Sequence, residues 1–169
     1  MGKEEQREPV KIKNAFAEFG TRHNYRCFGC SPFNEIGLQM EFWEAGELLM
    51  AKWQPRKSLE GWTDVLHGGI QAALMDELAG WIVLIKLRTS GVTSELNVKY
   101  SKPVNISKGE ITVQGKVISV EKRLAKIAVT LFDGEQQECA SAEVVYFYFP
   151  EKIARAKYHY PGHEAFYNK

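Results

Sequence analysis

The sequence lacks any apolar stretch long enough to cross a lipid bilayer. Its most apolar run, residues 81–87, already contains Lys86 and is followed by Arg88, whereas a spanning helix needs about 20 apolar residues. The N-terminal residues, MGKEEQREPVK, carry mixed charge and no apolar segment. They are therefore unlike a secretory signal or a basic transit peptide, and we expect no membrane span.

Cysteine is scarce, and neither sign of charge dominates. The 169 residues contain three cysteines and have a formal net charge of +1. A small, odd number of cysteines favours a reducing compartment, which together with the N-terminus predicts a cytoplasmic location. The balanced charge provides no general attraction to nucleic acid, and we expect no nucleic-acid partner. A chain of this length without repeats suits one compact domain.

The spacing of apolar residues predicts an α+β fold with one long helix. The helix begins at Gly68-Gly69 and continues to about Arg88, with apolar residues at i, i+3 and i+4. A second, short helix is predicted over 11–19. Segments rich in β-branched and aromatic residues predict two strands before the long helix and four after it, at 38–43, 48–53, 92–100, 110–120, 125–132 and 138–149. This order predicts an antiparallel sheet packed against the helix.

Two consecutive glycines open the long helix. Each costs about 1 kcal/mol of helix propensity relative to alanine, so Gly68 and Gly69 indicate a requirement for bare backbone at this point. The free N–H groups and the positive dipole of a helix start suit a carbonyl oxygen that gains negative charge. The alternative is that the glycines let the helix pack closely against a strand.

Two acidic residues interrupt the apolar helix. Asp76 is an ionisable group partway along it, and a buried carboxylate is costly unless it is paired or functional. It lies off the apolar stripe, so a solvated position is the alternative. Glu77 lies on the stripe, where it could be the buried partner of a basic residue or a substitute base.

The sequence resembles the HGG-type hotdog-fold acyl-CoA thioesterases, the group that includes phenylacetyl-CoA thioesterase and the mammalian thioesterase-superfamily proteins. The resemblance rests on His67-Gly68-Gly69, on Asp76 after six further residues, and on the strand GVTSELNVKY with Pro103 behind it. It implies a hotdog fold, an antiparallel sheet wrapped around one long central helix. We accordingly expect an N-terminal arm, short helix and cysteine loop at 1–35, a hotdog thioesterase domain at 36–149, and a C-terminal tail at 150–169.

The resemblance also implies the reaction and the residues that perform it. An acyl-CoA thioester would be hydrolysed to the free acid and CoA, with CoA as part of the substrate and no cofactor. Asp76 would act as nucleophile or general base, and the backbone N–H of Gly68, with Gly69 beside it, would polarise the thioester carbonyl. His67 would shape the helix entrance, and Thr93 would help to place the attacking water or the carboxylate.

Alternatives remain for several of these roles. The ring of His67 could simply be satisfied by neighbouring backbone, and Thr93 could be an ordinary strand residue. Members of the family often have Asn or Gln where this chain has Gly61. That departure leaves open a non-catalytic acyl-CoA-binding or regulatory hotdog protein. A hotdog dehydratase ranks last because it would need a catalytic histidine, whereas His67 belongs to the helix start.

The spacing within the helix predicts an oligomer. Gly68 and Asp76 are eight residues apart, which is about 12 Å along a helix, so one carbonyl cannot contact both. If both act on the same bond, the site combines Gly68 of one subunit with Asp76 of another, which requires a homodimer and permits a homotetramer. The CoA phosphates would need cations, and the candidates near strand ends, each otherwise a solvated surface charge, are Lys99, Lys102, Lys122 and Arg123.

Cys27 and Cys30 form a Cys-x-x-Cys pair. Such a pair can hold zinc or form a disulfide, but a structural zinc site needs four ligands. The obvious additional ligands, His23 and Cys139, are not arranged as a second pair. We therefore expect no metal site, and we interpret the two cysteines as loop residues beside the substrate entrance.

Overall fold

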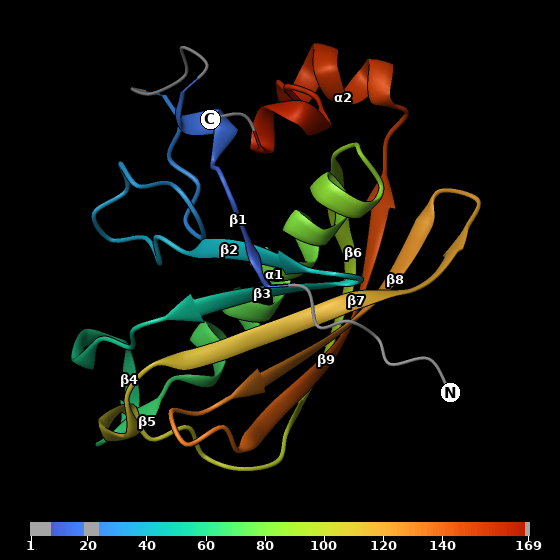
Figure 1. The fold of residues 1–169 in the computed structure, drawn as a ribbon. Coiled ribbons are helices and arrows are strands. Elements are labelled where there is room, and N and C mark those ends of the chain that lie inside the picture. The colour runs from blue at the N-terminus through green and yellow to red at the C-terminus, as the bar shows by residue number, and fades with distance from the viewer. Residues whose placement is uncertain (1–7, 19–23, 168–169) are drawn as a thin grey trace.

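A single curved sheet surrounds one long helix. The structure is a computed structural model that describes residues 8–18 and 24–167. Seven strands in the order β1-β2-β3-β7-β8-β9-β6 pair antiparallel throughout and wrap around α1 (Gly68–Lys86), as Figure 1 shows. The α+β hotdog fold that the sequence predicts is therefore confirmed.

The six predicted strands are present and differ from prediction by a few residues at their ends. They are β2 (Glu41–Ala45), β3 (Leu48–Trp53), β6 (Gly91–Tyr100), β7 (Ile111–Glu121), β8 (Leu124–Phe132) and β9 (Glu138–Tyr148). In β8, alternate residues are buried, as expected for a strand with one face on the core. Strand β6 ends the sheet at one edge, and most of its residues are exposed.

The predicted short helix at 11–19 is wrong, as far as the described residues 11–18 show. Residues Val10–Ile12 form strand β1, which pairs with β2, and only Ala15–Ala17 form a 3-10 turn, η1. The free edge of β2 offers hydrogen bonds to a β-branched segment, and this tertiary pairing overrides the helical spacing of Ile12, Ala15 and Phe16. Ile12 and Ala15 are still buried, so the apolar pattern marked burial but not the backbone conformation.

Short helices lie at both ends of α1, with short strands at its start. Near its start lie η2 (Lys57–Leu59), the pair β4 (Glu60–Trp62) and β5 (Val65–Leu66), and η3 (Ile106–Lys108). The C-terminal tail forms α2 (Glu151–Tyr158) and η4 (His163–Phe166) beyond the other end of α1 (Figure 1). The Lys13 N–H donates to the Phe166 carbonyl at 2.9 Å, so the N-terminal arm and the tail lie against each other.

Helix α1 provides the centre of the core. Leu74, Leu78 and Ile82 are fully buried on its sheet side, and Phe42 stacks on Trp81 with ring centroids 4.4 Å apart. By length and composition alone, α1 is also the one helix among the described residues that could cross a membrane. Core helices of folded domains share that property, and here the sheet covers the apolar side of the helix.

Candidate active site

The Asp76 carboxylate lies beside the edge strand of the sheet. The residue is half-buried on α1, and the Thr93 hydroxyl of β6 donates a hydrogen bond of 2.8 Å to its Oδ1. Burial raises the pKa of Asp76 above its ordinary value, and the Thr93 hydrogen bond partly opposes that rise. Asp76 is thus partly shielded from water and has no ion pair among the described residues.

A β-bulge lies directly after Thr93. Strand β6 pairs Thr93 with Tyr146 of β9, but then pairs Glu95 with Val145, so that Ser94 is the extra residue. Bulges re-aim side chains and recur beside active sites. The Tyr146 hydroxyl donates to the Asp76 backbone carbonyl at 3.3 Å, so two paired strand residues hold the same helix residue.

The two glycines at the start of α1 have different surroundings. His67 is the N-cap, and its Nδ1 accepts the Gly69 N–H at 2.9 Å. The Gly68 N–H has no hydrogen-bond partner within the described part of the chain, as is usual for the first residue of a helix. A Cβ at Gly68 would lie 3.5 Å from the Tyr100 ring, an ordinary contact, so close packing does not account for this glycine.

A hollow of about 630 Å³ opens in front of the helix start. Its lining includes Gly68, Tyr100 and Lys102, and also Gly61, the position where this chain departs from the HGG pattern. Of the four cationic candidates, only Lys102 lines the hollow. Lys122 and Arg123 lie in the β7–β8 turn beside Tyr148, at the opposite end of the β6–β9 pair.

The candidate residues fall into two groups. Asp76 and Thr93 are together at the edge strand, while His67, Gly68 and Gly69 are together at the helix start. Eight residues of one helix, about 12 Å, separate the Gly68 backbone from the Asp76 backbone. One chain therefore does not bring the two groups onto a single carbonyl.

Comparison with known proteins identifies the family. Residues 63–140 match the model of the thioesterase superfamily. The chain is also 34% identical over 112 residues to a Saccharolobus solfataricus protein described as a candidate esterase, a match that covers 65% of this chain and 72% of that protein. The chain belongs to the thioesterase superfamily. This membership supports hydrolysis of a thioester bond as the general chemistry of the site.

Solved structures agree with the fold of this superfamily member. A thioesterase-superfamily protein, RHA08564, superposes with a TM-score of 0.65 at 20% identity over 72% of this chain. That match spans 60% of the longer RHA08564 chain. A Streptococcus pneumoniae thioesterase-family protein, solved with coenzyme A, superposes with a TM-score of 0.57 at 19% identity, covering 62% of this chain and 80% of that one.

Glu77 of this thioesterase-superfamily protein faces a different environment from Asp76. Its Oε1 accepts a hydrogen bond from Trp81 Nε1 at 3.1 Å, and the Cys27 thiol lies 3.5 Å from the same oxygen. Burial raises the pKa of Glu77. No basic residue within 8–18 or 24–167 forms an ion pair with it, so the suggested basic partner is not found there.

Proposed function

We propose that this protein hydrolyses an acyl-CoA thioester to the free acid and CoA. The observation that carries the proposal is the half-buried Asp76 carboxylate, which Thr93 holds at the exposed edge of the sheet. A carboxylate that is desolvated without a cationic partner is costly, and such groups concentrate at functional sites. Membership of the thioesterase superfamily supports the reaction class.

Asp76 would supply the reactive oxygen or accept the proton of the attacking water. In the second route, water attacks the carbonyl carbon, its proton passes to the carboxylate, the C–S bond breaks, and the CoA thiolate leaves and takes up a proton. A raised pKa makes the Asp76 carboxylate a better proton acceptor than an ordinary aspartate. The Thr93 hydroxyl donates to Asp76, which leaves its own oxygen able to accept a hydrogen bond from that water.

The Gly68 N–H would stabilise the negative charge that develops on the carbonyl oxygen. It is unpartnered in the described chain and lies at the positive end of α1. Because Asp76 lies about two helical turns away on the same helix, the carboxylate acting on that carbonyl would come from a second copy. The exposed ten-residue edge of β6 supports this, since an unpaired strand edge can pair with another chain.

The CoA part of the substrate would bind near the helix start. The Streptococcus pneumoniae relative was solved with coenzyme A, and Lys102 lines the hollow beside Gly68. A Lys ammonium can bind phosphate as a point charge. Lys99, Lys122 and Arg123 remain candidates for the other phosphates. Lys122 and Arg123 lie at the opposite end of the β6–β9 pair, so they would come from the sheet of a second copy.

A thiol-release assay over short, long and aromatic acyl-CoAs tests the function. We expect saturable release of free CoA from at least one class, because the carboxylate and the bare amide are both present. A folded protein that releases no thiol from any class, yet binds acyl-CoA saturably, would instead support a binding or regulatory protein. Gly61 lines the hollow and lacks the amide side chain that the HGG-type pattern has there, and this departure is the observation that favours the second candidate.

Subunit mixing tests the composite site. Asp76→Asn and Gly68→Pro each inactivate one half of it, so either homo-oligomer should be nearly inactive. After unfolding and refolding together in equal amounts, hybrid dimers would carry one site with both halves intact, and about a quarter of the wild-type activity should return, by random pairing in a twofold dimer. If mixing restores nothing, although native mass spectrometry of differently tagged subunits detects hybrids, the Asp76 carboxylate and the Gly68 amide do not act together on one thioester across two subunits.

A further inference from the structure

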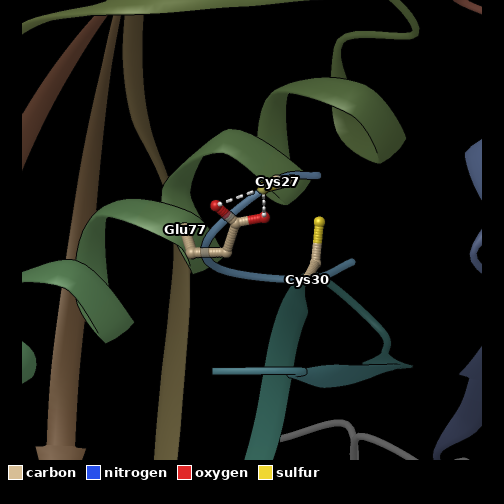
Figure 2. A group of neighbouring side chains, drawn as sticks. All are labelled: Cys27, Cys30 and Glu77. Atoms are coloured by element: carbon tan, nitrogen blue, oxygen red, sulfur yellow. Dashed lines mark hydrogen bonds between the residues drawn. The ribbon is translucent and has the colours of Figure 1, made fainter. Parts of the chain in front are cut away.

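A second group of chemically reactive side chains lies on the other side of Asp76. The N-terminal loop brings Cys27 and Cys30 onto α1 at Glu77, and the two thiols and the carboxylate point toward one another (Figure 2). Their Sγ and carboxylate oxygen atoms all lie within 4.8 Å of one another. No other such group of His, Cys, Asp and Glu occurs in the residues that the structure describes.

The distances suit tetrahedral metal coordination. With metal–sulfur and metal–oxygen bonds of about 2.3 and 2.1 Å, neighbouring ligand atoms of a tetrahedral zinc ion lie roughly 3.6–3.8 Å apart. The Cys27 Sγ is 3.5 Å from Glu77 Oε1 and 3.6 Å from Oε2. This pair therefore already has the required separation, and the 4.8 Å limit leaves only a small adjustment for Cys30.

The loop approaches Glu77 closely because residue 29 is glycine. A Cβ at Gly29 would lie 2.2 Å from the Glu77 carboxyl carbon, which is far closer than atoms can approach. Any side chain at this position would displace the carboxylate from the two thiols. The sequence Cys27-Phe28-Gly29-Cys30 thus provides both the sulfur ligands and the space for the oxygen ligand.

Neighbouring polar groups hold the three side chains in place. Tyr25 Oη lies 2.8 Å from Cys30 Sγ, and Trp81 Nε1 donates to Glu77 at 3.1 Å. Asn14 Nδ2 donates to the Cys30 carbonyl at 2.9 Å. Such outer partners orient the ligands of metal sites, and they come here from the arm, the loop and α1.

The charge balance around the group also favours a cation. Glu77 has no cationic partner in the described residues. A divalent cation would compensate the thiolates and the carboxylate together, which no described side chain does.

We propose that Cys27, Cys30 and Glu77 form a binding site for a borderline-soft divalent cation, with Zn²⁺ as the ion that best fits two sulfurs and one oxygen. The three residues line a cavity of about 570 Å³ between the loop, α1 and Tyr146. A tetrahedral ion with three protein ligands can take its fourth ligand, a water or a solute, from this cavity.

The sequence alone predicts no metal site, because the additional ligands considered there were only His23 and Cys139. Glu77 is 50 residues away from Cys27 in the sequence, and only the fold brings them together. A bound ion would fasten the N-terminal loop to the helix residue next to Asp76. It would therefore hold one wall of the 570 Å³ cavity in place.

Metal titration of the chelator-stripped full-length protein, kept reduced, tests the site. We expect one equivalent of Co²⁺ to give thiolate-to-metal charge-transfer absorption, and Zn²⁺ to displace it and raise the Tm, because an ion that binds only the folded state stabilises it. Cys27→Ser, Cys30→Ser and Glu77→Gln should each weaken affinity by more than the about 10- to 100-fold typical of outer-shell changes. Metal binding is measured without substrate, so the result is independent of thioester hydrolysis.

Two further variants guard against misfolding and non-specific binding. Cys139→Ser alters the buried cysteine of β9 and should keep the full stoichiometry and affinity. Gly29→Ala retains all three ligands but should lose affinity, because its methyl group displaces Glu77. The proposal would be overturned if the folded wild type formed no one-to-one metal complex, or if Cys139→Ser lost as much metal affinity as the ligand variants. It would also be overturned if a Cys27–Cys30 disulfide persisted under reduction in place of metal.

Discussion

Replacement of Asp76 by asparagine is expected to lower kcat/KM for thioester hydrolysis by about 10²- to 10⁴-fold, the range that a positioned general base contributes. Asparagine keeps the size of the side chain and can still accept the Thr93 hydrogen bond, so the fold should persist. Wild-type kcat/KM should fall as the pH drops through the Asp76 pKa, which burial places above the ordinary value. Thiol-release rates across pH should show that this acid limb is absent from the variant.

Glu77→Gln is the matched control for this prediction. It removes the neighbouring carboxylate of the same helix, which faces Cys27 and not Thr93, so its loss of activity should be far smaller. A variant Asp76→Asn that kept wild-type rates, with Glu77→Gln inactive, would transfer the role of base to Glu77 and refute the site as proposed.

Replacement of Gly68 by proline should lower kcat by about 10²- to 10³-fold, the typical effect of removing one oxyanion donor. Proline lacks the N–H yet is favoured at the first position of a helix. The preceding residue, His67, has ψ 134, which is compatible with a following proline. The helix should therefore form normally, which circular dichroism can verify, while steady-state kinetics report the loss of the donor.

Gly68→Ala distinguishes the effect of losing the N–H donor from the effect of adding a side chain at this position. Alanine retains the N–H, and its Cβ would meet the Tyr100 ring at 3.5 Å without a clash. This variant should keep a rate close to that of the wild type. Equal losses in the alanine and proline variants would mean that the space in front of the helix, and not the amide, limits the reaction.

The local pattern of the sequence predicts α1 and the strands β6 to β9 well. Apolar residues recur at i, i+3 and i+4 in the helix, whereas the strands are runs rich in β-branched and aromatic residues. Turn residues such as Asp133-Gly134 separate the strands. The pattern fails at β1, where Ile12, Ala15 and Phe16 have helical spacing but the free edge of β2 determines the conformation. The sequence pattern predicts no helix in the C-terminal tail, whereas the structure has α2 there. The Tyr160 hydroxyl, just after α2, donates to the Leu84 carbonyl of α1, a contact between distant residues that leaves no local pattern.

The candidate site is predictable only where its residues form a continuous motif. His67, Gly68 and Asp76 belong to one helix, and the resemblance supplies their proposed roles. Tyr146 is 70 residues from Asp76, and the bulge after Thr93 arises from pairing between strands. Neither leaves a periodic signal in the sequence, because both depend on contacts that form only in the folded chain.

Segments from both ends of the described chain converge on one aromatic ring of α1. Phe16 and Phe166 both contact the Trp81 ring, at centroid distances of 6.4 and 5.7 Å, and they also contact each other at 5.8 Å. Trp81 in turn donates to Glu77, the neighbour of Asp76. One indole ring thus touches an aromatic ring from each end of the described chain and also hydrogen-bonds the helix turn that carries the carboxylates.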